Sequence, residues 1–321
     1  MVARAFIVGG AGFIGSHLVD VCLKRKCQVW VYDNFSTGRK KFLPVDSALH
    51  VVEGDILDTK HLSDTIDECA PDTLYHLAAI HHIPTCEKMP NRALRVNVEG
   101  TQSVLNACAQ RLVPRILFAS TGALYDPINT GALVETSPVK AHDIYSISKL
   151  AGEQLLQYHV SKNDGQAIIA RLFNTVGQRE TNAHVIPAIM AQLAAGGRQI
   201  KLGNLHPRRD YVHVEDVVKA LFILGSMPID KPFDMFNIGS GQEYSVRELI
   251  ELCSEVIAEP LEIVSAPDLQ RKVDRPSQLA DLTKIQQTSG WKPIRTLKQA
   301  LCEVWDESLE KRDAHRHATA W

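Results

Sequence analysis

The chain has 321 residues, a formal net charge of −2 and a sequence pI near 6.7. This length predicts two domains, or one large domain with an added lobe, and either can bury a full core. The absence of a basic excess argues against nucleic-acid binding and a polybasic membrane patch, and no apolar run reaches the roughly 18 residues of a membrane span.

The seven cysteines are odd in number and include no CxxC pair, which is typical of reduced thiols in a reducing compartment. The N-terminal stretch MVARAFIVGGAGFIG is interrupted by glycines, so it indicates a buried strand and turn rather than a signal peptide. We therefore expect a soluble, cytoplasmic protein whose main partner is a small molecule, with no nucleic acid and no membrane among its partners.

In the first half of the chain, short β-branched runs alternate with stretches of helical periodicity. The expected strands are Ala5–Val8, Gln28–Tyr32, Leu49–Glu53, Thr73–His76, Arg115–Ala119 and Gln166–Leu172. The expected helices between them are Ile14–Lys24, His61–Glu68, Ala93–Gln110 and Tyr145–His159. Because βαβ crossovers are right-handed, this order predicts an α/β fold with a doubly wound parallel sheet of the Rossmann type.

After about residue 174 this rhythm loosens, and the expected helices are Ile186–Ala194, Val214–Leu224 and Val246–Ile257. We expect residues 1–173 to form the Rossmann domain, with residues 211–237 returning to it. Residues 174–210 and 238–321 would form a smaller, C-terminal substrate lobe. The polar end after about Glu310, with His315 and His317, is expected to fray, and its spacing favours no metal site.

The first expected strand leads directly into the glycine-rich turn GGAGFIG. Gly9 would permit the tight turn, Gly12 would let a pyrophosphate approach the backbone, and Gly15 would let the helix pack on the strand. At the end of the second strand, Asp33 can accept hydrogen bonds from a ribose diol and would repel a 2′-phosphate, which favours NAD over NADP. Asp55 and Ile56 follow the third strand and would lie near the adenine.

Tyr145 and Lys149 stand four residues apart, on one face of an expected helix. A protonated Lys149 would favour the phenolate and lower the tyrosine pKa from about 10, which would make Tyr145 a useful base near neutral pH. Thr121 stands just after an expected strand, so it would meet this pair at the carboxyl edge of the sheet.

Five segments, GGAGFIG, HLAA, NVEGT, ASTGALY and YSISK, resemble those of extended short-chain dehydrogenases/reductases of the nucleotide-sugar epimerase/dehydratase family. The resemblance implies that Tyr145 is the acid/base, that Lys149 holds the nicotinamide ribose, and that Thr121 hydrogen-bonds the sugar hydroxyl being oxidised. It also implies a homodimer, because helices at this position of the family commonly pair. The residues then expected at NAD are Gly9, Gly12, Phe13, Ile14, Gly15, Asp33, Asn34, Asp55, Ile56, Leu77, Ala78, Ala79, Asn97, Tyr145 and Lys149.

The resemblance extends to a nucleotide-sugar clamp in the second lobe. The stretch RRDYVHV implies that Arg209 pairs with the diphosphate, and Asn174 matches an asparagine that reaches the same group. Counting back from Ala280-Asp281 implies Arg271 on the phosphate and Asp274 on the ribose. Arg275 is a rival for the arginine role, because a local insertion could shift the frame by four residues.

Four further positions bear on substrate choice. His184 and Val185 would frame the sugar and base of a UDP-sugar, which is the expected substrate. Leu202 replaces an aromatic residue that often stacks on the base, and Gln278 stands where side-chain bulk gates an N-acetyl group at sugar C2. Glutamine is intermediate in size between the serine and tyrosine of the family, so both hexoses and N-acetylhexosamines are permitted.

Oxidation at sugar C4 would give a ketone that can be reduced to the 4-epimer or lose water. Family 4,6-dehydratases place Asp-Glu directly after the threonine, whereas this sequence has Gly122-Ala123. Neither residue can transfer a proton, so 4-epimerisation is favoured. An elimination would need an acid or base from elsewhere, and the candidates are Cys86, His81, His82 and Asp126.

Three alternatives remain open from the sequence. The chain also resembles the family's UDP-N-acetylglucosamine 5,6-dehydratase of tunicamycin biosynthesis, which eliminates water and returns the hydride to C4. A non-enzymatic NAD-binding sensor is disfavoured because the chain keeps Tyr145, Lys149 and Thr121. An NADP-linked carbonyl reductase would need a cation in place of Asp33.

Overall fold

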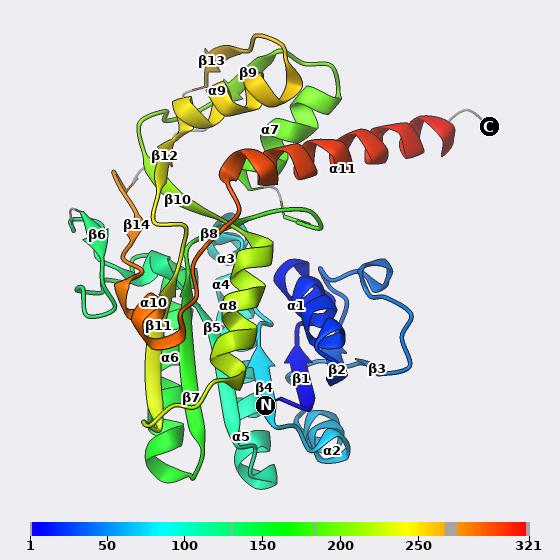
Figure 1. Ribbon diagram of the computed structural model, residues 1–321, viewed down its shortest axis with the longest axis vertical. Helices are drawn as coiled ribbons and strands as arrows, with labels where there is room; N and C mark the ends of the chain where they lie inside the picture. Colours follow the sequence, from blue (N-terminus) through cyan, green and yellow to red (C-terminus); the bar gives the residue numbers. More distant parts are fainter. Residues whose placement is uncertain (1, 130, 183, 267–274, 319–321) are drawn as a thin grey trace.

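The computed structural model describes residues 2–129, 131–182, 184–266 and 275–318, with the backbone alone for Ser265 and residues 314–318. Its largest element is a seven-stranded sheet with the order β11-β7-β5-β4-β1-β2-β3, in which all neighbours are parallel (Figure 1). The strands are β1 (Arg4–Val8), β2 (Gln28–Asp33), β3 (Leu49–Glu53), β4 (Thr73–His76), β5 (Arg115–Thr121), β7 (Gln166–Leu172) and β11 (Phe233–Ile238). The predicted α/β sheet of the Rossmann type is confirmed.

Helices cover both faces of this sheet. Successive side chains of a strand point to opposite faces, and apolar side chains lie on both. On β1, Ala5 and Ile7 pack with one face, whereas Phe6 and Val8 pack with the other. The first face is covered by α1 (Phe13–Lys24) and α8 (Val214–Ser226). The second is covered by α2 (Thr59–Cys69), α5 (Gly100–Arg111) and α6 (Ile144–Lys162).

The predicted helix Ala93–Gln110 is wrong as a single regular helix. The chain forms α3 (Ile83–Lys88), α4 (Pro90–Leu94), a π-helical turn at Arg95–Glu99 and then α5. The turn contains Asn97, whose buried side chain hydrogen-bonds both backbone groups of Ile80 and the hydroxyl of Ser148. Such widened turns are frequent at functional sites, and here the turn accompanies tertiary contacts that helical periodicity does not reveal.

A smaller lobe lies at one end of the large sheet and has its own apolar core (Figure 1). Its strands are β8 (Asn174–Val176), β9 (Gln199–Leu202), β10 (Arg208–His213), β12 (Glu243–Ser245) and β13 (Glu262–Ser265). Its helices are α7 (Val185–Ala194), α9 (Val246–Ile257) and α11 (Leu297–Ala318). The expectation that the chain frays after Glu310 is wrong, because α11 continues to Ala318. Among the described helices, none combines the length and hydropathy that a membrane span needs.

The chain crosses between the two parts more than once. β11 pairs with β7 in the large sheet, and α8 packs against α1. The short strands β6 (Ala132–Leu133) and β14 (Leu279–Ala280) pair with each other, and α10 (Thr283–Ser289) packs near β11. The division into residues 1–173 with 211–237, and 174–210 with 238–321, stays a proposal.

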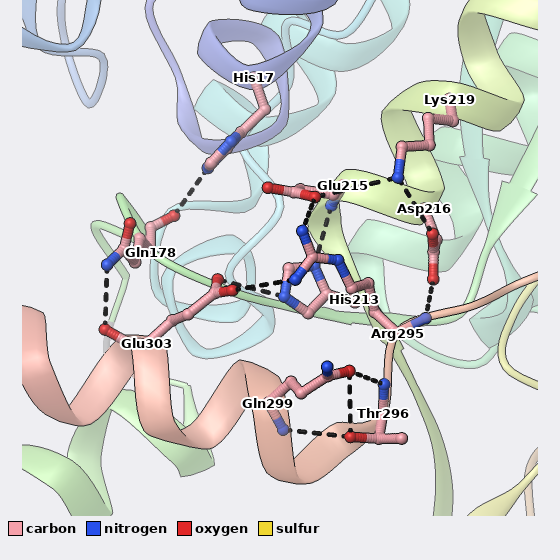
Figure 2. Close-up of polar contacts among 10 residues, drawn as sticks. All are labelled: His17, Gln178, His213, Glu215, Asp216, Lys219, Arg295, Thr296, Gln299 and Glu303. Carbon is pink, nitrogen blue, oxygen red and sulfur yellow. Dashed lines mark hydrogen bonds and ion pairs between the residues drawn. The ribbon is translucent and has the colours of Figure 1, made fainter.

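A polar network fastens α11 to the start of α8 (Figure 2). His213 lies 3.1 Å from Glu303 of α11, and its other ring nitrogen accepts from the backbone N–H of Glu215. Arg295 pairs with Glu215 at 2.6 Å, and its backbone N–H donates to Asp216. Since α11 also packs in the core of the smaller lobe, these contacts fix that lobe against the helices of the large sheet.

Candidate active site

A cavity of about 1080 Å³ runs from the glycine-rich turn at the carboxyl edge of the large sheet to the smaller lobe. This is where ligands bind in open parallel α/β sheets. Most of the residues predicted to bind a cofactor or substrate line it. They are Gly9, Gly12, Phe13, Ile14, Gly15, Asp33, Asn34, Asp55, Ile56, Leu77, Ala78, Ala79, Thr121, Tyr145, Lys149, Asn174, His184, Val185, Leu202, Arg209 and Gln278.

The glycine-rich turn connects β1 to α1 in a conformation that needs glycine. Gly9 has φ +81°, and a Cβ atom there would lie 2.7 Å from the backbone nitrogen of Ala78. Gly12 is the N-cap of α1, and no side chain caps the helix. The first turn carries no acidic residue either, so its N–H donors and positive dipole face the cavity without a competing anion.

Asp33 lies at the end of β2 and is buried. One carboxylate oxygen accepts from the backbone N–H of Ala11 at 2.9 Å, and the other accepts from Phe35 at 2.8 Å. Burial raises the pKa of Asp33 from its ordinary value, against the opposing effect of these hydrogen bonds. Asn34 donates to Asp55 at 3.0 Å, which orders the next strand end beside it.

Thr121, Tyr145 and Lys149 all reach the cavity wall. Thr121 is the last residue of β5, and Tyr145 and Lys149 are one turn apart near the start of α6. The helix begins with a capping box in which Asp143 accepts from Ser146, so the local sequence itself fixes where this turn starts. The Lys149 ammonium group lies 4.2 Å from the ring centroid of Phe118.

The expected lowering of the Tyr145 pKa is not found. Desolvation raises the pKa of Tyr145 above its ordinary value, and the hydrogen bond with Thr121 only partly opposes this. Desolvation also lowers the pKa of Lys149 to about 7, with Glu153 acting in the opposite direction. The prediction from the helix spacing failed because it counted the charge of Lys149 but not the burial of both groups.

Of the four candidates for an extra acid or base, two line the cavity and two do not. His81 and His82 lie on the wall. Cys86 is buried behind it, its thiol donates to the carbonyl of Ile80, and desolvation raises the pKa of Cys86 to about 11. Asp126 is also absent from the wall, because its carboxylate accepts from the backbone N–H of Ile128 within its own loop. The structure therefore does not bring Cys86 and Asp126 to the cavity with the two histidines, and their role as an extra acid or base stays a prediction.

Asn97 also lies behind the wall rather than on it. Its contacts with Ile80 and Ser148 join the loop after β4 to α6, so it orders the cavity from beneath. Its place among the residues predicted to contact NAD stays a prediction.

In the second lobe, Arg209 lines the cavity and its guanidinium donates to the carbonyl of Arg275 at 2.7 Å. Arg271 and Asp274 lie outside the described residues. Arg275 is buried, and it donates to the carbonyls of Gly122, Ala123 and Tyr125. Those contacts direct its guanidinium into the loop after β5, and it does not line the cavity. Arg275 thus supports the loop after β5, and its rival role on the diphosphate stays a prediction.

Sequence reasoning missed the polar groups that support these side chains. Glu153 accepts from Arg171 at 2.7 Å and also from Ser120. Glu180 and Asn182 lie on the cavity wall in the loop after β8. The contacts of Glu153 join residues that are far apart in the sequence, so no local pattern could have indicated them.

The residues of the first part of the cavity fit a dinucleotide. The N-terminus of α1 has no side-chain cap and suits a pyrophosphate. At Gly9 the turn passes so close to the backbone of Ala78 that only glycine fits. The Asp33 carboxylate stands at the strand end where a ribose diol binds. Residues 5–239 match the family model described as "NAD dependent epimerase/dehydratase family".

Curated relatives and solved structures agree with this match. The chain is 30% identical to a UDP-glucose 4-epimerase of Corynebacterium glutamicum, with 94% of each chain covered. It is also 30% identical to a GDP-6-deoxy-D-mannose reductase of Pseudomonas aeruginosa, with 97% of this chain and 100% of the relative covered. The structure of a Thermotoga maritima UDP-glucose 4-epimerase with UDP-glucose superimposes with a TM-score of 0.88 at 26% identity, covering 97% of this chain and 99% of that one. A Thermus thermophilus UDP-glucose 4-epimerase with NAD gives 0.86 at 28% identity, covering 95% and 98%.

The fold and the site thus define an α/β enzyme that binds a dinucleotide at the carboxyl edge of its sheet. The chain belongs to the NAD-dependent epimerase/dehydratase family, and NAD is its cofactor. The predicted class, an NAD-dependent nucleotide-sugar epimerase/dehydratase, is confirmed.

Proposed function

We propose that the enzyme converts a UDP-hexose or UDP-N-acetylhexosamine into its 4-epimer. The observation that carries the proposal is the convergence of Thr121, Tyr145 and Lys149 on a cavity that also contains the glycine-rich turn and Arg209. The similarity to UDP-glucose 4-epimerases over nearly the whole chain supports it.

In this proposal each protein group has a defined task. Bound NAD would supply an acceptor for hydride from the sugar C4, and the reduced form would return it. Thr121 would hold the C4 hydroxyl, and Tyr145 would take its proton and later give it back. Lys149 would hold the nicotinamide ribose, and in its protonated form it would stabilise the phenolate of Tyr145.

The loop after Thr121 favours return of the hydride to the sugar C4 over elimination of water. Gly122 and Ala123 have no titratable side chain, and their carbonyls accept hydrogen bonds from Arg275. A 4,6-elimination needs groups that move protons at C5 and C6, and neither Gly122 nor Ala123 offers one. None of the relatives described above is a 5,6-dehydratase, so that alternative is less well supported than 4-epimerisation.

Gln278 is the residue proposed to govern the substituent at sugar C2. Its side chain is buried beside the loop, and its Nε2 lies 2.9 Å from where a Cβ on Gly122 would stand. The polar side chain leaves room for either a hydroxyl or an N-acetyl group, so both UDP-glucose and UDP-N-acetylglucosamine are proposed substrates.

We also propose a homodimer in a reducing, cytoplasmic setting. The seven cysteines are unpaired thiols, which supports the reducing compartment.

On α6, Ile147 is 45% exposed and Tyr158 63% exposed, and a second copy of α6 could cover them. Light scattering of the purified protein tests the dimer, and a monomer at micromolar concentration would contradict it.

One incubation tests the reaction. The protein is mixed with UDP-glucose or UDP-N-acetylglucosamine, and the product is followed by mass and by NMR of the sugar C4. An unchanged mass with inverted C4 is expected. Loss of one water, about 18 Da, would instead identify a dehydratase, and no change with either substrate would refute the proposed substrates.

A further inference from the structure

Two histidines and a glutamate meet on the wall of the cavity. His81, Glu180 and His184 each offer one ligand atom, and these atoms all lie within 4.8 Å of one another. His81 comes from the loop after β4, Glu180 from the loop after β8, and His184 immediately precedes α7. All three residues are partly buried and line the cavity.

The surrounding contacts orient the three side chains toward one another. The rings of His81 and His184 have centroids 5.4 Å apart. Glu180 accepts from the backbone N–H of Asn182 at 2.8 Å through Oε1, while Oε2 receives no hydrogen bond from another described residue. The Nε2 atom of His81 lies 3.2 Å from the Asn182 amide nitrogen.

The charge of Glu180 also lacks a protein counterion in the described part of the chain. No Lys or Arg there forms an ion pair with it, and the neighbouring Arg179 pairs with Asp20 at 2.9 Å. A partly buried carboxylate is stabilised by a nearby cation. Here the groups next to it are two imidazole rings, which are themselves metal ligands.

We propose that His81, Glu180 and His184 form a binding site for a divalent transition metal, with Zn²⁺ the best-matched ion. Two imidazoles and one carboxylate with an open position are a typical catalytic zinc donor set, whereas Mg²⁺ and Ca²⁺ prefer oxygen ligands. Ligand distances of about 2.0–2.2 Å would require the three side chains to close by about 1 Å, with the Asn182 amide moving off His81.

The open coordination position would face the cavity, because all three donors lie on its wall. An ion there would take an oxygen of the nucleotide-sugar, either a sugar hydroxyl or a phosphate oxygen. The sequence predicted no metal because His81 is far in the sequence from Glu180 and His184, which lie in one loop between β8 and α7.

The test measures metal binding directly and does not depend on turnover. Chelator-treated protein is titrated with Zn²⁺ by calorimetry and with Co²⁺ by visible absorption. One equivalent per chain is expected at the site. Zn²⁺ binding should weaken by more than about 100-fold in each of the variants His81→Ala, His184→Ala and Glu180→Gln. Loss of a metal ligand should exceed the 10–100-fold loss of affinity that is typical when a residue hydrogen-bonded to a ligand is replaced.

Three controls make the result specific. His206→Ala removes an exposed histidine elsewhere, and His315→Ala/His317→Ala removes two from the C-terminal helix. Both proteins should still bind one equivalent, and NAD binding by every variant shows that it is folded. Absence of Zn²⁺ binding, or binding that the three ligand variants leave unchanged, would overturn the site without touching the proposed epimerase reaction.

Discussion

Glu153 and Arg171 form a buried ion pair between the helix and the strand that support the reactive groups. Two guanidinium nitrogens of Arg171 donate to the Glu153 carboxylate at 2.9 and 2.7 Å, and the side chains are only 4% and 5% exposed. Glu153 also accepts from Ser120, which precedes Thr121, and it lies one helical turn beyond Lys149. The pair therefore joins both elements beneath the cavity.

Breaking this pair should destabilise the fold strongly. Glu153→Gln or Arg171→Met leaves a buried charge without its partner, which costs about 3–5 kcal/mol. The double variant should cost less than the sum, because neither charge is then left alone. Urea unfolding of the four proteins measures both effects, and a single-variant cost below about 1 kcal/mol would contradict the buried pairing.

Lys149 should make stability depend on pH. Its pKa in the fold is lowered to about 7 by desolvation, whereas in the unfolded chain it keeps its ordinary value of 10.5. Between these values the unfolded chain binds more protons, so the free energy of unfolding should rise with pH by up to about 1.4 kcal/mol per pH unit. Below about pH 7 both states are protonated, and this gain is absent.

Lys149→Met isolates that contribution. The variant should lose the rise between about pH 7 and pH 10.5, while Lys162→Met on the exposed end of α6 should keep it. Denaturant unfolding without added cofactor, at several pH values, gives the comparison. Parallel curves for the wild type and Lys149→Met would contradict the lowered pKa.

The parts of this enzyme that follow from local sequence could be predicted, and the parts built by tertiary contacts could not. The glycine-rich turn, the β-branched strands and the Tyr145–Lys149 spacing are local signals, and each lies where it was expected. The pKa of Tyr145 was predicted in the wrong direction, because desolvation depends on everything that packs around it.

Loop residues show the same limit. Asp126 stands in the sequence next to Tyr125, yet it caps its own turn instead of reaching the cavity. Arg275 could have matched a phosphate-binding arginine by a shift of four residues, and only the structure reveals its bonds to the loop carbonyls. The sequence shows which side chains a loop contains. The direction in which each side chain points depends on contacts with residues that are far away in the sequence.

Tyr145→Phe should remove the proton transfer while leaving the cavity intact. Turnover should fall by about 10²–10⁴-fold, the usual contribution of a positioned acid/base. NAD affinity should change little, because the ring and its packing are kept. Tyr158→Phe, on the same helix but away from the cavity, is the matched control; it keeps the ring offered to the proposed dimer contact and should keep full activity. Unimpaired turnover by Tyr145→Phe would refute the role of Tyr145.

Gln278 should set the preference at sugar C2. Gln278→Tyr fills the space beside Gly122 and should lower kcat/KM for UDP-N-acetylglucosamine relative to UDP-glucose by roughly tenfold or more. Gln278→Ser should shift the ratio in the opposite direction. Competition assays with both substrates measure the ratio, and an unchanged ratio in both variants would show that the C2 group lies elsewhere.

Arg275 should hold the loop after β5 in its active shape. Arg275→Met removes the donors to Gly122, Ala123 and Tyr125, and each buried carbonyl left unsatisfied costs about 1–3 kcal/mol. Because Thr121 directly precedes this loop, kcat should fall while NAD affinity is retained. Arg275→Lys can restore only part of the contact, since one ammonium cannot match the fork of a guanidinium. Arg198→Met, which breaks a surface pair with Glu259, is the control and should be silent. Equal kcat in Arg275→Met and the wild type would show that the loop keeps its shape without this arginine.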